Sequence, residues 1–588
     1  MRRKKLISRL TTLALATIGC LLLALLAPIF LAYRAPVEPF SGNSVMASPR
    51  DLHVITAPIR LSGAPDVTLI RGVLYADGNA AAGTPISRFV LDGPVFSFNA
   101  SGARATSPGF EASMGEAPAI APLVEQLMTM GFDTLAIRRG TLNVTALDGT
   151  VETISDIEAE VTGRRKDQIT ARGSFTVRGQ SLKIEAALSS PTDKRAPLRW
   201  PAKFTLKGSL LDASFDGHFD LAEDIQLSGQ AEISTPSLRR AARWFGVLLT
   251  NAPGLNATTI KGQIRWARRT FAVENAKVIV DGNEAAGTLS LNLAGERPLI
   301  DGTLAFNALD LTPYAQAARS QSFVFDRETA SWSAFDISMP IIRHVDADLR
   351  ISAPKVAMSG FGLGRGAATI SVRSGKLLAD IAELDLHAGT VSAQISADMN
   401  DFVPRYAMRG RVEKFEAGRA AAAMFGTTAL SGRSTLAVDV AGSGQTPTEI
   451  LRHLSGKATL TMPEGGRIGL DLKGLRGAAK TGEGAAWTMM SKGQTNLEQV
   501  EARAHIQDGV LITEAVQARV GSAGVGASGR VDLVEGTLNL DLLMKPEVPA
   551  DRPLKAVDLL GGDAVRVTGT WRQPLVQGVE RNTGLAPK

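Results

Sequence analysis

The chain has 588 residues, more than one ordinary hydrophobic core accommodates, so several domains or one repetitive architecture are expected. Hydrophobic residues make up 44% of the chain, which is enough to bury a core and excludes a fully disordered protein. Aromatic residues are only 5%, whereas 58 residues are glycine. This composition fits aliphatic strands joined by tight turns, and it disfavours a nucleic-acid partner, which would need stacking aromatics beside basic patches.

The net charge of +6 is concentrated at the N-terminus, residues 1–9. This basic tail holds five positive charges and no acidic residue, and subtracting five from six leaves about +1 on residues 10–588. Residues 10–33 are uncharged, and a helix of that length would cross a bilayer core of about 30 Å. The positive-inside rule then predicts a cytoplasmic tail, with the bulk of the chain across the membrane.

Two other interpretations of this N-terminal segment stay open. A cleavable signal peptide would have a shorter apolar stretch, and a lipoprotein site would use Cys20, the only cysteine. We favour an uncleaved transmembrane helix because the apolar run continues well past Cys20. All three interpretations export the bulk of the chain, and a single cysteine excludes a disulfide framework.

Residues 34–60 are rich in proline and serine and are predicted to be a linker. From residue 61 onward, apolar and polar residues alternate as in half-buried strands, and about 35–45 strands are expected. Ile468, Leu470 and Leu472 follow the same alternation and are expected in a strand. We predict that an apolar groove is lined by Leu289, Leu291, Leu293, Leu304, Phe306, Val391, Ile395, Leu436, Val438, Val440, Leu538, Leu540 and Leu542.

Glycine motifs divide this pattern into repeats. Asp281-Gly282, Ser374-Gly375 and Asp508-Gly509 are predicted hairpin turns, because these residues tolerate positive φ. Repeated short strands with one apolar face favour an elongated sheet over a compact catalytic domain. Six Gly-Thr-(Leu/Val) triplets are predicted to open new strands, starting at Gly140, Gly149, Gly287, Gly302, Gly389 and Gly536.

Few helices are predicted, and all are short. Pro122–Phe132 and Pro236–Leu249 carry apolar residues at helical spacing, the second with Thr235 as the expected N-cap. A third helix is expected over Thr446–Leu454, with Thr446 as N-cap and Pro447 in the first turn.

Three passages resemble the AsmA family of envelope proteins in Gram-negative bacteria. The first runs from Lys261 to Tyr314 and includes Val278-Ile279-Val280-Asp281-Gly282. The second runs from Ile450 to Leu472, and the third from Ile506 to Leu542. The resemblance implies an inner-membrane anchor, a periplasmic, curved β-sheet groove with an aliphatic lining, and a role in moving phospholipids toward the outer membrane.

These observations predict an all-β fold: an elongated, strongly curved, repetitive antiparallel sheet that forms an apolar groove, with a few short helices and one N-terminal transmembrane helix. The predicted divisions are the basic tail 1–9, the transmembrane helix 10–33, the linker 34–60, an N-terminal β-groove region 61–235, a helical insert 236–255, central repeats 256–445, a C-terminal AsmA-like region 446–573 and a tail 574–588.

No catalytic, cofactor or metal site is expected. The six histidines have no ligand spacing, and neither a Gly-x-Ser-x-Gly elbow nor a Gly-Lys-Ser/Thr phosphate loop occurs. A β-solenoid hydrolase with an unrecognised carboxylate pair stays open. The basic groups 164–166 and 268–269 could meet lipid headgroups, although solvated strand ends are the commoner role for such groups.

We therefore expect a non-enzymatic, single-pass inner-membrane protein whose bulk lies in the periplasm. It would bind phospholipids, move them between the two membranes and support outer-membrane integrity. Outer-membrane or periplasmic proteins are possible partners, and the alternative function is a scaffold that assists outer-membrane protein assembly. The aliphatic stripes could also form an ordinary closed sandwich core that binds nothing.

Overall fold

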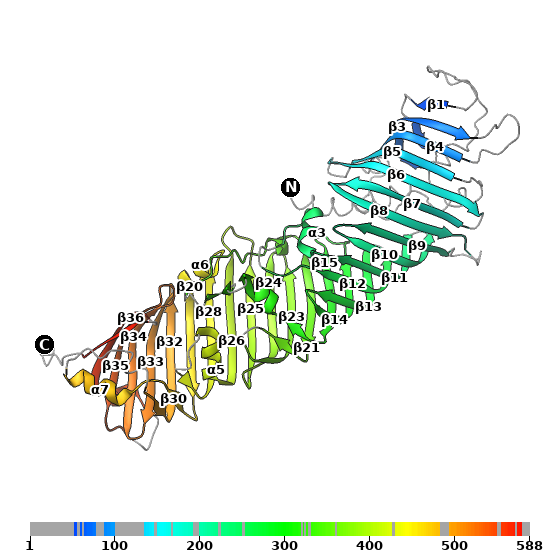
Figure 1. Cartoon of the computed structure of the whole chain (residues 1–588). Helices are drawn as coiled ribbons and strands as arrows, with labels where there is room; N and C mark the ends of the chain where they lie inside the picture. Colours follow the sequence, from blue (N-terminus) through cyan, green and yellow to red (C-terminus); the bar gives the residue numbers. More distant parts are fainter. Residues whose placement is uncertain are drawn as a thin grey trace. The chain divides into compact units, whose positions relative to one another are not determined.

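The structure is a computed structural model of the chain, and an all-β fold is its main feature (Figure 1). The predicted basic tail 1–9, the transmembrane helix 10–33 and the helix Pro122–Phe132 lie outside the described residues. No helix in the described part is long and apolar enough to cross a membrane. The structure describes residues 52–55, 59–61, 64–77, 88–99, 134–145, 150–165, 168–191, 199–221, 225–249, 253–267, 269–318, 321–322, 325–326, 331–358, 361–425, 430–481, 493–549, 554–570 and 573–578.

The chain divides into two compact units. Unit 1 comprises residues up to 249 together with 255–302, and unit 2 comprises residues 250–254 and 303–588. The strands of unit 1 are β1 (Leu52–Ile55), β2 (Ile59–Leu61), β3 (Ala64–Asp77), β4 (Arg88–Asn99), β5 (Thr134–Thr145), β6 (Val151–Arg165), β7 (Gln168–Val177), β8 (Gln180–Ser189), β9 (Arg199–Gly208), β10 (Asp212–Leu221), β11 (Ile225–Thr235), β12 (Thr258–Ala267), β13 (Thr270–Val280) and β14 (Asn283–Asn292).

In unit 1, each strand from β5 to β14 pairs antiparallel with the next along the chain. The sheet begins earlier than the predicted residue 61, because β1 and β2 both pair with β3. The prediction of a purely antiparallel sheet is wrong at β4 and β5, which are parallel. Residues 100–133 separate these two strands, and such a long connection permits the crossover that a parallel pair requires.

Unit 2 contains a second antiparallel ladder, in which consecutive long strands lie side by side (Figure 1). Its strands are β21 (Asp346–Ala353), β23 (Leu363–Arg373), β24 (Lys376–Leu386), β25 (Gly389–Asp398), β26 (Arg405–Glu416), β28 (Arg433–Ser443), β29 (Ser455–Met462), β32 (Gln499–Gln507), β33 (Val510–Val520), β34 (Ala523–Asp532), β35 (Thr537–Lys545), β36 (Asp563–Thr570) and β37 (Pro574–Gly578).

Short strands lie outside these two ladders. A small separate sheet joins β27 (Leu430–Ser431), β30 (Gly466–Ile468) and β31 (Thr495–Leu497). The other short pairs are β16 (Leu309–Asp310) with β22 (Val356–Ala357), β17 (Gln316–Ala318) with β18 (Gln321–Ser322), and β19 (Phe325–Asp326) with β20 (Ser331–Trp332). With β15 (Leu299–Phe306), the described residues form 37 strands, within the expected range, although several have only two residues.

The predicted hairpin turns are confirmed. Asp281 and Gly282 have φ of 51° and 84°, and Ser374-Gly375 and Asp508-Gly509 also have positive φ at both residues. Two consecutive residues of this kind give the twist that a two-residue hairpin needs.

The Gly-Thr triplets at Gly140, Gly287 and Gly302 do not open strands, so that part of the prediction is wrong. They lie inside β5, β14 and β15, whereas Gly389 and Gly536 do stand at strand starts. At Gly140 the register with β6 shifts, and an added Cβ would lie 2.9 Å from the Ile137 side chain. Glycine is therefore required there by the close approach of chains at a bulge.

The short helices partly match the prediction. Helix α6 (Pro447–Arg452) begins at the expected N-cap, Thr446, whose hydroxyl accepts a hydrogen bond from the Glu449 N–H at 3.2 Å. Helix α3 (Leu238–Trp244) is shorter than predicted, and its N-cap is Ser237. The Thr235 hydroxyl instead donates to the Leu210 carbonyl.

Three α-helices of the described residues were not predicted: α4 (Thr312–Ala315), α5 (Ala417–Phe425) and α7 (Leu472–Thr481). The expected strand through Ile468, Leu470 and Leu472 ends at Ile468, and α7 begins at Leu472. Leu470 and Leu472 are buried in a cluster with strands that are distant in sequence. Tertiary burial thus overrides an alternation that is too short to distinguish strand from helix.

Replacing Thr446 by alanine removes the side-chain cap of α6 and should lower the free energy of unfolding by about 1 kcal/mol. Thr446→Ser keeps the hydroxyl and should stay near the wild type. Urea denaturation followed by circular dichroism measures both variants. Equal losses in the two variants would contradict the capping role.

Candidate apolar binding face

One face of the unit 2 sheet is apolar over many consecutive strands. The strand register aligns Ile395 with Met408 and Met408 with Val440, and it aligns Val391 with Val412 and Val412 with Leu436. Because side chains alternate between the two faces of a strand, these aligned positions all share one face. We call it the apolar face of unit 2, and its central members are Ala379, Ile381, Leu384, Val391, Ala393, Ile395, Met408, Gly410, Val412, Leu436, Val438, Val440, Ala458 and Leu460.

The central part of this face is neither a closed core nor a free surface. Val391, Ile395, Leu436, Val438 and Val440 are all half-buried. Met408, in the same face, is 38% exposed. A closed sandwich core would bury these side chains, so their partial exposure argues against that interpretation for β25 to β28.

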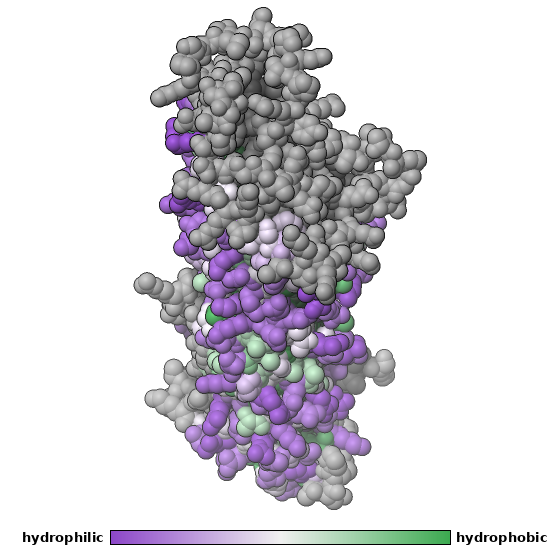
Figure 2. Space-filling view, turned by 90° about the vertical axis from the view of Figure 1, so that its right-hand side faces the viewer, coloured by the Kyte–Doolittle hydropathy of each residue, from purple (hydrophilic) through white to green (hydrophobic). Residues whose placement is uncertain are grey.

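The opposite face is charged and exposed. Arg409 contacts Asp439 across β26 and β28 at 2.8 Å, and Arg566 contacts Asp541 across β36 and β35 at the same distance. Each exposed pair stabilises the fold by only about 0–1 kcal/mol, so the pairs chiefly keep this face in water. Figure 2 views the molecule from the right-hand side of Figure 1, and most of the described residues visible there are hydrophilic, with hydrophobic ones in a limited patch.

The middle row of the apolar face contains several small residues, although Ile381 and Val438 also belong to it. Ala393 aligns with Gly410, and Val438 aligns with Ala458, which aligns with Ala504. Gly410 has no side chain and Ala393, Ala458 and Ala504 each have only a methyl group, so these positions project less from the sheet than Val, Ile or Leu. The larger side chains of the flanking rows, such as Ile395 and Leu436, stand on either side. The side-chain sizes therefore indicate a shallow trough at these small residues.

Residues 331–343 follow one edge of this face. The Trp332 indole N–H donates to the Leu533 carbonyl at 2.8 Å, and the Ile337 N–H donates to the Gln445 carbonyl at 2.9 Å. Farther along, the Arg343 guanidinium donates to the carbonyls of Met399 and Asp401. Nearby, Ile342 is buried with Val372, Ala397 and Met399. This segment therefore ties the ends of strands that would otherwise contact only their neighbours.

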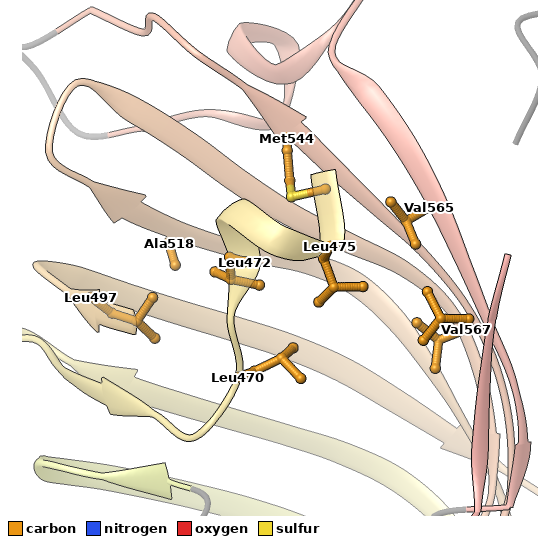
Figure 3. Close-up of a cluster of buried hydrophobic side chains, with 9 residues drawn as sticks. Leu470, Leu472, Leu475, Leu497, Ala518, Met544, Val565 and Val567 are labelled. Carbon is orange, nitrogen blue, oxygen red and sulfur yellow. The ribbon is translucent and has the colours of Figure 1, made fainter. Parts of the chain in front are cut away.

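The C-terminal end of the apolar face is covered by the chain itself. Leu470, Leu472 and Leu475 form a buried cluster that also contains Leu497, Ala518, Met544, Val565, Val567 and Val576. Figure 3 shows α7 lying over strands that curve around it, with its leucines directed toward them. The predicted groove residues Leu538, Leu540 and Leu542 pack against this cluster.

Unit 1 has its own apolar face, with larger residues. Leu289 aligns with Val273, and Leu291 aligns with Phe271. The Phe271 ring meets Trp266 edge to face at 6.3 Å between centroids, and Phe204 stacks on Phe215 at 5.4 Å. Phe215 is only 2% exposed, so part of this face is covered.

The predicted groove residues thus fall into separate groups. The structure brings together Val391, Ile395, Leu436, Val438 and Val440 in the accessible part of unit 2. Leu289 and Leu291 belong to unit 1, and Leu293 follows the end of β14. On β15, Leu304 is buried and Phe306 is half-buried.

Sequence reasoning missed Met408, Gly410 and Ala458. These residues lack the aliphatic alternation that identified the others, and only the register places them on the same face. The basic group 164–166 and Arg268 lie outside the residues whose side chains are described, while Arg269 lies in the turn between β12 and β13. Among the described residues, no group of three or more acidic, histidine or cysteine side chains could hold a metal ion.

One buried titratable group lies at the edge of unit 2. His387, in the turn between β24 and β25, is 8% exposed, and within the described structure its Nε2 has no hydrogen-bond partner. Burial lowers the pKa of His387, and the positive charge of Arg419 acts in the same direction. The neutral imidazole is therefore the form that suits the folded state.

Comparison with known proteins identifies the region that contains this face. Residues 254–515 match the model of the AsmA family. This match confirms the resemblance predicted from the sequence. No curated protein and no solved structure matches the chain.

The pKa of His387 predicts a pH dependence of stability. The unfolded chain, with a histidine pKa of about 6.5, binds a proton more readily than the folded one. The contribution of His387 is therefore complete above pH ~6.5 and is lost as the pH falls from there toward the folded-state pKa. Urea midpoints at several pH values should fall less on acidification in His387→Gln than in the wild type. Parallel profiles would contradict this assignment.

Proposed function

We propose that this chain, whose residues 254–515 match the AsmA family, is a non-enzymatic protein that binds phospholipid acyl chains and moves them between the inner and outer membranes. The observation that carries this proposal is the accessible apolar face of unit 2. Its central strands, β23 to β29, all lie within the matched residues. Outer-membrane integrity would depend on this transfer.

The chemistry of the apolar face suits hydrocarbon chains. Removing one CH₂ group from water contributes about 0.8 kcal/mol, so ten methylenes contribute about 8 kcal/mol. The lining from β24 to β29 consists of Ala, Val, Ile, Leu, Met and Gly, which offer contact area without polar partners. An acyl chain would lie along the trough, and its polar headgroup would stay at the edge of the face, in water.

The repetition of the face supports movement as well as binding. Neighbouring strands offer nearly the same side chains at aligned positions, for example Val412 beside Leu436 and Leu436 beside Leu460. A chain that shifts by one strand exchanges one aliphatic surface for another of similar affinity. No deep minimum then holds it, and lipid could slide along the sheet. Partner proteins would supply any driving force.

The location follows from the N-terminal pattern. Residues 10–33 would anchor the protein in the inner membrane, with the basic tail in the cytoplasm and the remainder in the periplasm. Phospholipid would enter from the anchored side. A scaffold for outer-membrane protein assembly would instead use strand edges, and the experiments below separate the two functions.

A photo-reactive amino acid at Val438 should form lipid adducts in cells, because this half-buried side chain lies in the trough. The neighbouring position Asp439 is exposed and points to the opposite face, so it serves as the control and should give none. Mass spectrometry of the purified full-length protein identifies the adducts. Protein adducts alone at Val438 would favour the scaffold, and no adducts at either position would overturn the transport proposal.

Adjacent positions of β25 offer a matched pair of substitutions. Ile395 lies in the apolar face, whereas Gln394 is exposed on the other face. Ile395→Glu would place a charge where acyl chains lie and should reduce co-purifying phospholipid roughly tenfold or more. Gln394→Glu adds the same charge to the same strand and should leave phospholipid unchanged. Equal lipid content in the two variants would contradict an acyl-chain site here.

A further inference from the structure

Helix α7 covers a part of the apolar face. The strand register in this part would otherwise present the same aliphatic rows to a ligand. The register continues the rows of the central strands through β33, β34 and β35, where Val516 aligns with Ala527 and Ala527 aligns with Leu542. The last of these residues packs against the cluster that contains Leu470, Leu472 and Leu475. The leucines of this segment therefore occupy the same kind of surface that remains accessible from β25 to β28.

Among the described residues, the hydrogen bonds that hold the covering segment lie at its base. The Asp471 carboxylate accepts hydrogen bonds from the N–H groups of Lys473 and Gly474 at 3.1 and 2.9 Å. The Thr495 hydroxyl donates to the Leu470 carbonyl at 2.7 Å and accepts from the Leu472 N–H at 3.2 Å. These contacts fix the point where α7 leaves the small sheet β27-β30-β31.

Beyond its base, the described side chains of α7 meet the sheet through apolar contacts. Leu475 is completely buried, and its cluster partners on β36 and β37 are Val565, Val567 and Val576. Such contacts have no directional requirement, and a hydrocarbon chain could replace them at the same surface. A hydrogen-bonded cover would not be exchangeable in this way.

The helix is also intrinsically weak. It has ten residues, and two of them, Gly474 and Gly477, are glycines inside the helix. Isolated helices of this length are marginal in water, and glycine lowers helix stability further. A Cβ added at Gly477 would meet nothing within 4 Å, so close packing does not explain this glycine.

We propose that α7 is a displaceable cover that occupies the C-terminal end of the acyl-chain face and yields this surface to an arriving lipid. This inference rests on the proposed function. It adds that the release of lipid from the C-terminal end of the face is regulated by α7. In the closed state, Leu472 and Leu475 take the place of hydrocarbon. In the open state, α7 pivots at Asp471 and Thr495, and the acyl chain contacts Leu540 and Val567.

Two substitutions should move this equilibrium in opposite directions. Gly477→Ala strengthens the helix without a steric clash and should reduce lipid adducts at a photo-reactive Leu540 by about fivefold. Leu475→Ala weakens the packing of the cover and should raise these adducts by about tenfold or more. A probe at Val438, in the accessible face, should respond little to either change.

The experiment uses the full-length protein in cells, with phospholipid adducts quantified at both probes in each background. The result that would overturn the cover proposal is a Leu540 adduct yield that is the same in the wild type, Gly477→Ala and Leu475→Ala, while Val438 still forms adducts. The proposed function would then remain intact. Adducts at neither position would overturn both. Urea midpoints identify any loss of folding in Leu475→Ala, and Gly477→Ala tests the proposal without that risk.

Discussion

The structure depends on the cross-strand register that backbone hydrogen bonding imposes within each ladder. A shift of one residue would turn every side chain of a strand to the other face. From β24 to β29 the register shifts only at bulges, between Ile381 and Leu384 and between Val412 and Phe415, and aliphatic residues contributed by separate hairpins still meet in rows. The ion pairs of the opposite face contribute little energy. A shift in register, however, would place their charges among aliphatic side chains, which reinforces the same alignment.

Accessibility distinguishes the parts of the apolar surface. In unit 1 much of the apolar face is buried, including Phe215, Ile264 and Val273. In the centre of unit 2, the small residues Ala393, Gly410 and Ala458 leave a trough between larger aliphatic rows. At the C-terminal end the chain places its own leucines on the sheet. One alternating pattern thus yields a filled face, an open face and a covered face.

The functional proposal follows from this difference, together with the match of residues 254–515 to the AsmA family. An open aliphatic trough offers contact area but no chemical selectivity, which suits hydrocarbon chains and disfavours polar ligands. The short helix α7 matters because it covers such a surface with contacts that a ligand could replace. Binding and its control would then use the same physical interaction, the removal of apolar surface from water.

The sequence by itself determined the elements whose signals are local. Alternation over five or more residues identified the long strands, Asp-Gly and Ser-Gly pairs identified the hairpin turns, and Thr446 with Pro447 identified the start of α6. The family was also recognisable, because its motifs follow one another in order along the chain. Only the tertiary structure decided which faces are open, since burial depends on what another segment places above a strand. Leu470 and Leu472 alternate like strand residues but form a cover, and Gly140 resembles a strand start but permits a bulge. Contacts between distant residues likewise determine three other features, which no local pattern encodes. These are the parallel pairing of β4 with β5, the trough at Gly410 and the burial of His387.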